Sequence, residues 1–350
     1  MHQHSINTMR MKELFIIIGF CISSLIVYSQ CHVPGTVENI YCTEGTDLEK
    51  TEFAPDGSKI MVIKPYGDLI IGDSTFTYNP PPGKNSCRRI VKFNDAGTPV
   101  WNYALYSSFL NIKDMDIDAS GNIYIGGSFS DTILYVGNDT TLKKSNTDRD
   151  IFLAMFNSAG ELQWAKSYIM PNSQDLMSIE LADASTLYFT GSNNDTMLVF
   201  DGVTKYKTVD NGVSFYMAKF NTSSRQAEWV LNGGMSSCKG HDIKIGSDGF
   251  IYVLGTFYDF YDFFIDTVEV KKPSFSNHNP YFLAKISGSG TCLWARSPDG
   301  GFFDGFYTKL AIDNNNNLYI TNTVGIYPFV IEGDTMDYRK NSAILLKYSK

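Results

Sequence analysis

Short stretches of alternating hydrophobic and polar residues, separated by turns rich in Gly, Asn and Asp, run along most of this chain. Apolar and polar residues alternate over 112–118, and the turn sequence Ala119-Ser120-Gly121-Asn122 follows. Strands are predicted next over 123–129 and 151–156, and a further strand surrounds Trp164. Strands of this length, with turn residues about every dozen positions, are typical of sheets made by hairpins. The pattern therefore predicts an all-β chain without a helix of useful length.

Three kinds of residue recur along the chain at one spacing. The tryptophans are Trp101, Trp164, Trp229 and Trp294, which lie 63, 65 and 65 positions apart. Tyrosines preceded by Ile or Leu recur at Tyr124, Tyr188, Tyr252 and Tyr319, which lie 64, 64 and 67 positions apart. A short apolar strand ends at each of Ile71, Val136, Phe200, Ile265 and Ile331, which lie 64 to 66 positions apart. The shared spacing indicates a tandem repeat of about 64 residues with five copies.

A repeat of this length with four principal strands matches one blade of a β-propeller better than it matches a short-period solenoid. We therefore predict an all-β fold, a β-propeller built from about five tandem blades of roughly 64 residues, each with four antiparallel strands. The blades occupy residues 46–350, and residues 30–45 form an N-terminal extension. The fifth copy lacks its tryptophan strand. Either the segment Cys31–Cys42 supplies a ring-closing strand, which would remove exposed sheet edges, or the sequence is a fragment of a longer protein.

The amino terminus has the pattern of a secretory signal peptide over residues 1–29. Basic residues precede an apolar run over 14–27, and small residues precede a cleavage point after Ser29. The run is too short to cross a bilayer, and no later segment is long and apolar enough to do so. An alternative is a lipoprotein acylated at Cys31, although Gln30 fits that motif poorly. The sequence thus predicts export to an extracellular or outer cell-surface location.

Composition and charge narrow the classes of partner. Hydrophobic residues make up 43% of the chain, enough for a packed core, and 24 Phe, 21 Tyr and 29 Gly favour strands and tight turns. The formal net charge of −8 disfavours nucleic acid as a partner. Five cysteines remain after signal removal, and no C-x-x-C pair indicates zinc or thiol exchange. Any disulfide is therefore expected to be a local staple.

Two strings in the second copy resemble the blade motif of the secreted bacterial β-propeller repeat proteins, the SBBP type of Bacteroidota. They are DIFLAMFNSAGELQWAK over 150–166 and DIDASGNIYIGG over 116–127, and the pair recurs in register along the chain. The resemblance implies an extracellular β-propeller, often a type IX secretion cargo with a carboxy-terminal sorting domain. This chain ends at Lys350 without such a domain, and it has five copies where the family name refers to seven. The resemblance implies no enzymatic activity.

Asp114, Asp116 and Asp118 alternate along one strand ahead of Gly121 and Asn122, an oxygen-rich pattern that resembles a calcium loop. The pattern does not recur in the other copies. The residues eight positions before the repeated tyrosines are Asp116, Glu180, Lys244 and Ala311. A hairpin turn explains Asp and Asn without a metal, because their side chains satisfy backbone N–H groups. The sequence therefore predicts no cofactor, with calcium as an open alternative.

The sequence contains no recognisable catalytic or metal-binding constellation. The histidines that remain after signal removal are His32, His241 and His278, and none has the spacing of a metal site or a catalytic triad. Aromatic residues in two connecting segments are instead candidate ligand-binding residues: Tyr258, Phe260, Tyr261, Phe302 and Phe303. Exposed rings stack on sugars or anchor a protein partner, whereas packing between blades is their commoner use.

The function expected from the sequence is that of a binding, adhesion or scaffold module with an unknown protein or glycan ligand. The alternative is an extracellular polysaccharide-acting hydrolase with catalytic carboxylates at the mouth of the propeller channel, since 37 acidic residues offer many pairs. A third reading is a structural fragment that needs missing blades. Six triplets such as Asp131-Thr132-Ile133 resemble O-glycosylation acceptors, although turn chemistry explains them as well.

Overall fold

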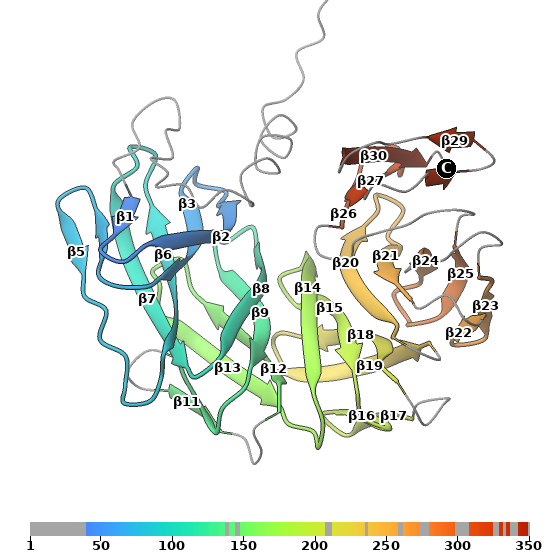
Figure 1. Cartoon of the computed structure of the whole chain (residues 1–350), viewed down its shortest axis with the longest axis horizontal. Helices are drawn as coiled ribbons and strands as arrows, with labels where there is room; N and C mark the ends of the chain where they lie inside the picture. The colour runs from blue at the N-terminus through green and yellow to red at the C-terminus, as the bar shows by residue number, and fades with distance from the viewer. Residues whose placement is uncertain are drawn as a thin grey trace, which may run out of the picture.

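The computed structural model describes residues 40–136, 140–143, 148–206, 212–234, 237–257, 262–272, 280–297, 308–324, 329–331, 334–336 and 342–348. Within these ranges every regular element is a β-strand, and neighbouring strands pair in the antiparallel direction (Figure 1). The all-β prediction is confirmed for this part of the chain. None of its elements is a helix long and apolar enough to span a membrane. The signal peptide predicted over residues 1–29 lies outside the described residues.

Most of the strands belong to units in which consecutive strands pair in chain order. The first unit contains β2 (Thr46–Phe53), β3 (Lys59–Pro65), β6 (Ser86–Phe93) and β7 (Pro99–Ser107). The second contains β8 (Leu110–Ile117), β9 (Ile123–Phe129), β12 (Asp150–Phe156) and β13 (Leu162–Tyr168). The third contains β14 (Gln174–Asp183), β15 (Thr186–Asn193), β18 (Ser214–Asn221) and β19 (Gln226–Gly233). The fourth contains β20 (Lys239–Ile245), β21 (Ile251–Thr256), β24 (Tyr281–Ile286) and β25 (Cys292–Arg296), and the fifth contains β26 (Lys309–Ile312), β27 (Leu318–Val324) and β30 (Ser342–Tyr348).

Each unit also contributes a short hairpin between its second and third strands. The hairpins are β4 (Leu69–Ile71) with β5 (Ser74–Phe76), β10 (Ile133–Val136) with β11 (Thr140–Lys143), β16 (Met197–Phe200) with β17 (Val203–Tyr206), β22 (Phe263–Ile265) with β23 (Val268–Val270), and β28 (Phe329–Ile331) with β29 (Asp334–Met336). The five apolar marker residues of the repeat end the first strand of these hairpins, so the predicted hairpins are confirmed.

Two of these hairpins join the sheet of the preceding unit. β10 of the second unit pairs with β7 of the first, and β22 of the fourth pairs with β19 of the third, which extends each of these sheets to six strands. At the amino-terminal end, β1 (Ile40–Cys42) pairs with β4 of the first unit. Residues 30–39 lie outside the described residues, and a ring-closing strand from this segment stays a prediction.

Apolar side chains fill the space between consecutive units. Leu153 and Trp164 of the second unit pack with Leu176, Phe189 and Tyr216 of the third in one buried cluster. Three further clusters join the first unit to the second, the third to the fourth and the fourth to the fifth. The units therefore stack face to face, because each sheet has an apolar side that must be covered by its neighbour.

The two aromatic markers of the repeat meet within the second, third and fourth units. The rings of Tyr124 and Trp164 lie 6.3 Å apart between centroids, and Tyr252 and Trp294 repeat this edge-on contact at 6.3 Å. In the third unit, Tyr188 and Trp229 lie 5.8 Å apart. Aromatic pairs at such distances stabilise a sheet beyond the area that they bury. The common spacing of the tyrosines and tryptophans thus follows from a contact between the second and fourth strands.

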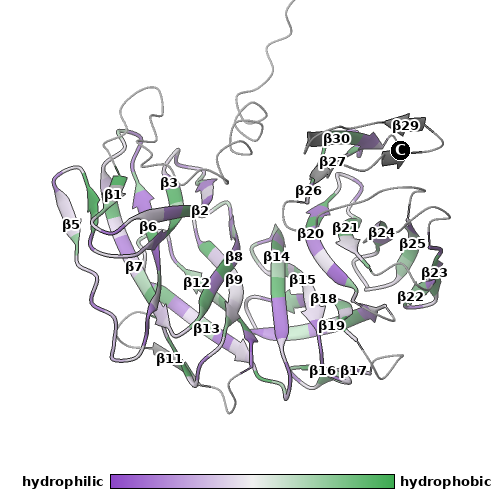
Figure 2. Ribbon diagram, viewed as in Figure 1, coloured by the Kyte–Doolittle hydropathy of each residue, from purple (hydrophilic) through white to green (hydrophobic). Residues whose placement is uncertain are grey.

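The first strands of the units, β2, β8, β14, β20 and β26, lie next to one another in this order on the inner side of the array (Figure 1). Figure 2 shows hydrophilic segments, in purple, on β14 and β20. Among the cysteines that the structure describes, Cys42, Cys87 and Cys292 are free thiols. The inner first strands are the place where polar side chains of different units come together.

Candidate functional site

The inner strands carry chemically distinct residues at two matched positions, which together we call the axial cluster. One position is occupied in the five units by Lys50, Asp114, Ser178, Asp242 and Lys309. The other is occupied by Glu52, Asp116, Glu180, Lys244 and Ala311. Each set is defined by its pairing partners on the second strands, so the repeat places one residue per unit at equivalent points.

A β-bulge precedes the first set in each of the first four units. The register shifts between Leu48 and Lys50, between Ile112 and Asp114, between Leu176 and Ser178, and between Gly240 and Asp242. A bulge places two residues opposite one and re-aims the side chains next to it. The repeated bulge therefore gives the residues of the first set the same backbone surroundings in these four units.

The Asp114 carboxylate joins three units. Its Oδ1 accepts a hydrogen bond from Lys50 Nζ at 3.0 Å, and its Oδ2 accepts bonds from Ser178 Oγ at 2.7 Å and from the backbone N–H of Ile179 at 3.0 Å. Burial alone would raise the pKa of this carboxyl group. The positive charges of Lys50, Lys309 and Lys244 and the Ser178 bond outweigh that effect and hold its pKa well below the usual range. Asp114 is therefore ionised and fully engaged.

Asp242 repeats this arrangement between the third, fourth and fifth units. Its Oδ2 accepts a hydrogen bond from the backbone N–H of Leu310 at 2.9 Å and lies 3.7 Å from Lys309 Nζ. Its Oδ1 lies 3.0 Å from Ser178 Oγ. Since a hydroxyl group has one proton, Ser178 donates to Asp114 or to Asp242 at any moment. The serine thus links two buried carboxylates.

The second set contains carboxylates with fewer cationic partners. Glu180 forms an ion pair with Lys244, and burial raises the pKa of Glu180 against that charge. Asp116 accepts backbone hydrogen bonds from Leu181 at 2.7 Å and from Ile117 at 2.8 Å. Glu52 keeps contact with solvent. Partial desolvation, and after it the charges of Asp116 and Asp114, raises the pKa of Glu52 to about 7.

His241 occupies the bulge of β20. Its side chain is buried, and its Nε2 lies 2.7 Å from Thr256 Oγ1. Burial, and after it the charge of Lys239, lowers the pKa of His241 to about 4. The imidazole is therefore neutral near pH 7 and is held by a hydroxyl group. His32 and His278 lie outside the described residues.

The three alternating aspartates of the calcium pattern have separate surroundings. Asp118 accepts hydrogen bonds at 2.9 Å from the backbone N–H groups of Ser120 and Asn122, which are the turn bonds that the sequence predicts. Asp114 and Asp116 instead bond to the third unit, as described above. Across the described ranges, no group of three or more His, Cys, Asp or Glu residues is arranged to hold a metal ion.

The candidate ligand-binding aromatics Tyr258, Phe260, Tyr261, Phe302 and Phe303 lie outside the described residues. They therefore stay predictions. Phe257 precedes the first of these segments and is buried against Phe263, with ring centroids 4.7 Å apart. The Phe257 ring therefore packs in the core.

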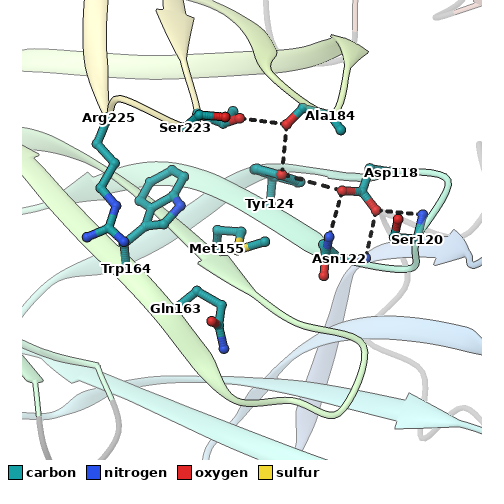
Figure 3. Close-up of a pocket in the computed structure, with 11 residues that line it drawn as sticks. Asp118, Ser120, Asn122, Tyr124, Met155, Gln163, Trp164, Ala184, Ser223 and Arg225 are labelled. Atoms are coloured by element: carbon teal, nitrogen blue, oxygen red, sulfur yellow. Dashed lines mark hydrogen bonds between the residues drawn. The ribbon is translucent and has the colours of Figure 1, made fainter.

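A pocket of about 320 Å³ opens between the second and third units, and we call it the junction pocket (Figure 3). Its floor consists of Asp118, Tyr124, Met155, Trp164 and Thr222. Its exposed rim consists of Ser120, Gln163, Ala184, Ser223 and Arg225. An amide, hydroxyl groups, a guanidinium group and an indole lie around this open pocket.

Tyr124 and Asp118 fix one side of the junction pocket. The Tyr124 hydroxyl group lies 3.4 Å from Asp118 Oδ2 and 3.4 Å from the carbonyl oxygen of Ala184, and Asp118 also accepts from Asn122 Nδ2 at 2.8 Å (Figure 3). Burial and the charge of Asp118 raise the pKa of Tyr124 to about 12, so its hydroxyl group remains a donor. This side of the pocket is preorganised.

Sequence reasoning identified the second axial set by its spacing but did not predict that its members pair across units. It missed the junction pocket, although a signal for it was present. The interval from the last apolar residue of the third strand to the tryptophan is eight positions in three units, as from Phe156 to Trp164, and nine from Phe220 to Trp229. The extra residue lies in the turn that contains Arg225.

No family model and no curated protein sequence matches this chain. The residues of the axial cluster and of the junction pocket are therefore interpreted from their own geometry and chemistry.

Proposed function

We propose that the chain is a secreted or cell-surface β-propeller of about five units, similar to the secreted bacterial β-propeller repeat proteins, that acts as a binding, adhesion or scaffold module. The order of the inner strands supports the ring. Lys50 of the first unit and Lys309 of the fifth both act electrostatically on Asp114 of the second. Because a ring brings its first and last blades together around one axis, contacts of this kind are what a propeller requires.

The observation that carries a binding role is the state of the axial carboxylates. Asp114 and Asp242 accept hydrogen bonds from lysine, serine and backbone groups of neighbouring units. A catalytic carboxylate needs a free face toward a substrate, whereas these two are consumed in joining the units. The axis therefore serves as a structural connector, which leaves the outer surfaces and the junction pocket for a ligand.

The binding role is tested by thermal unfolding of residues 30–350 alone and with a panel of neutral and acidic glycans. A ligand that binds the native state selectively raises its melting temperature in a concentration-dependent way. Unfolding in the presence of calcium and of a chelator separates metal binding from glycan binding. A panel that leaves the transition unchanged, together with no binding to immobilised cell-surface polymers, would remove the binding role.

A second candidate is the polysaccharide-acting hydrolase, because two axial glutamates have raised pKa values. A carboxyl group that stays protonated near neutral pH is what a general acid in glycoside hydrolysis needs. Glu52, with its pKa raised to about 7 and contact with solvent, is the better acid, and Glu180 is the second carboxyl. Release of reducing ends from a polysaccharide, abolished by Glu52→Gln or Glu180→Gln, would establish this role. Equal product release by these variants and the parent protein would eliminate it.

We expect Glu52→Gln to reduce the fall in melting temperature between about pH 5 and about pH 8. The pKa of Glu52 is raised to about 7 in the folded chain, and an unfolded glutamate has a pKa of about 4.3. Between these values the folded state holds a proton that the unfolded state has lost, so stability decreases as the pH rises. Glutamine cannot ionise, and its variant lacks this slope.

Glu228→Gln is a control for the pH experiment. The hydrogen bond from Lys219 lowers the pKa of Glu228, so the stabilisation by ionised Glu228 is present above about pH 4.3 and is lost only at lower pH. Between about pH 5 and about pH 8 its replacement is therefore expected to leave the slope of melting temperature against pH unchanged. Parallel curves of melting temperature against pH for Glu52→Gln and the parent protein would contradict the raised pKa of Glu52.

A further inference from the structure

The turn between the third and fourth strands differs in one unit. In the second unit this turn is Asn157-Ser158-Ala159-Gly160-Glu161, and in the fourth it is Ser287-Gly288-Ser289-Gly290-Thr291. In the third it is one residue longer and has no glycine, Asn221-Thr222-Ser223-Ser224-Arg225-Gln226. Gly160 and Gly290 have φ values of 84° and 85°, and Arg225 adopts 58° at the corresponding bend. A bulky residue thus occupies a backbone conformation that favours glycine.

At the junction of the first and second units, and at that of the third and fourth, this turn receives the tryptophan of the preceding unit. The Trp101 indole N–H donates to the Ser158 carbonyl oxygen at 3.2 Å, and a Cβ atom on Gly160 would lie 2.6 Å from the Trp101 ring. Trp229 donates to the Gly288 carbonyl oxygen at 3.0 Å, and a Cβ atom on Gly290 would lie 2.8 Å from its ring. Glycine is needed because the indole covers the turn.

At the junction of the second and third units this contact is replaced by the junction pocket. Trp164 packs against Phe220 with ring centroids 5.6 Å apart, and its indole N–H donates to none of the described residues. The turn is instead held by Lys166, whose Nζ donates to the Arg225 carbonyl oxygen at 2.6 Å. The longer turn therefore opens a space of about 320 Å³ with an indole at its floor.

The polar groups of the junction pocket differ in their availability. The Asp118 carboxylate is engaged by Ser120, Asn122 and Tyr124. The exposed Arg225 guanidinium group forms no hydrogen bond or ion pair with the described residues, and the Gln163 side chain donates only to the nearby Glu161 carbonyl oxygen at 3.2 Å. The groups that remain for a ligand are a guanidinium group, an amide, an indole N–H and the exposed Ser223 hydroxyl group.

We propose that the junction pocket binds a sugar that carries a carboxylate, such as a uronic acid residue. The unpaired guanidinium group matches a carboxylate with two parallel hydrogen bonds, the Gln163 amide and the Ser223 hydroxyl group suit sugar hydroxyls, and the Trp164 edge offers an apolar surface with one donor. A volume of about 320 Å³ lies at the lower end of small-molecule pockets, about 300–1,000 Å³, and suits one sugar unit. This inference rests on the proposed binding role and names its ligand class.

The test uses galacturonic acid and its trimer as probes and galactose as the neutral match, with residues 30–350 and a readout of tryptophan fluorescence and calorimetry. Galacturonic acid is expected to bind, and galactose to bind at least about tenfold more weakly, because a charge-assisted bond is lost. Arg225→Gly is expected to reduce galacturonic acid affinity by about tenfold or more. The substitution removes the guanidinium group. Because Arg225 has a φ of 58°, which glycine adopts readily, the fold is retained. Trp164→Phe is expected to abolish the fluorescence response.

Arg296→Gly serves as a matched control, since Arg296 is exposed and lies against Trp294 in another unit. It is expected to leave galacturonic acid affinity unchanged. Equal affinity for galactose, unchanged affinity in Arg225→Gly, or no binding of galacturonic acid and its trimer would each overturn the inference. If these probes fail while another glycan raises the melting temperature, the ligand class is wrong and the binding role stands. Failure of every glycan and polymer would remove both.

Discussion

Replacement of Asp114 by alanine should lower the free energy of unfolding by about 3–5 kcal/mol, the usual cost of breaking a buried ion pair. The Asp114 carboxylate is buried and accepts from Lys50, Ser178 and the Ile179 backbone. Without it, a lysine and a backbone N–H of two other units lose their acceptor in a poorly hydrated place. Chemical denaturation of the variant and the parent protein at neutral pH measures this loss.

The same substitution has a pH dependence of known sign. Lysine charges hold the pKa of Asp114 below its usual value, so its stabilisation is present above about pH 4 and is lost as the pH falls toward the folded-state pKa. The difference between parent and variant should therefore shrink in acid. As a control, Asp47→Ala breaks an exposed pair, 3.7 Å from Lys64, and should cost less than about 1 kcal/mol. A comparable cost for both variants would refute the connector role of Asp114.

Gly191→Ala should destabilise the chain by about 3 kcal/mol or more, above the usual range for overpacking. A Cβ atom at Gly191 would lie 1.8 Å from the backbone oxygen of Asp175 and 2.9 Å from the Tyr216 hydroxyl group. Those two atoms are joined by a hydrogen bond of 3.1 Å that passes over the glycine. The added methyl group must separate β14 from β15 or break this bond, since backbone cannot rotate away. Thermal and chemical unfolding report the loss.

Gly288→Ala is the matched control, because its nearest neighbour would be the Tyr188 hydroxyl group at 3.7 Å. Its effect should stay within about 0.5 kcal/mol, as for an ordinary surface substitution. Gly127 and Gly255 occupy the position of Gly191 in the second and fourth units, and a Cβ atom there would lie 2.0 Å and 2.3 Å from backbone oxygens of Asn111 and Lys239. A mild effect of Gly191→Ala would show that the bulged strands can separate at low cost.

The repeat could be predicted from the sequence because its markers are contacts that every unit needs. Trp164 and Tyr124 keep their identity along the chain, since each pair packs within its own sheet. The axial positions vary for the opposite reason. Glu180 and Lys244 stand at one repeat position but form an ion pair with each other, so neighbouring units need complementary residues rather than identical ones. The residues that interrupt the calcium-like pattern in the sequence, such as Glu180 and Lys244, are interaction partners in the folded chain.

The sequence indicates the junction pocket only as one irregular turn, because the pocket arises from a contact that is missing. Arg225 stands where three other turns have glycine, and a single added residue in a turn has no consequence that sequence alone can assign. Only the position of the Trp164 indole, turned toward Phe220, shows that the added residue leaves an open space. The electrostatic effect of Lys309 on Asp114 likewise joins residues far apart in the chain, so no local pattern in the sequence indicates it.

Because β10 pairs with β7 and β22 pairs with β19, the boundaries of these sequence repeats do not coincide with the boundaries of the sheets. A cut at a repeat boundary, for example between β7 and β8, would strip the first sheet of a hairpin encoded downstream. Such neighbouring repeats are thus interlocked, because a hairpin of one repeat completes the sheet of the repeat before it. In a linear array of repeats the coupling at each interface decides how far unfolding spreads, and strand exchange raises that coupling. Melting of one repeat exposes the edge of the previous sheet, so the array is built to unfold as one block.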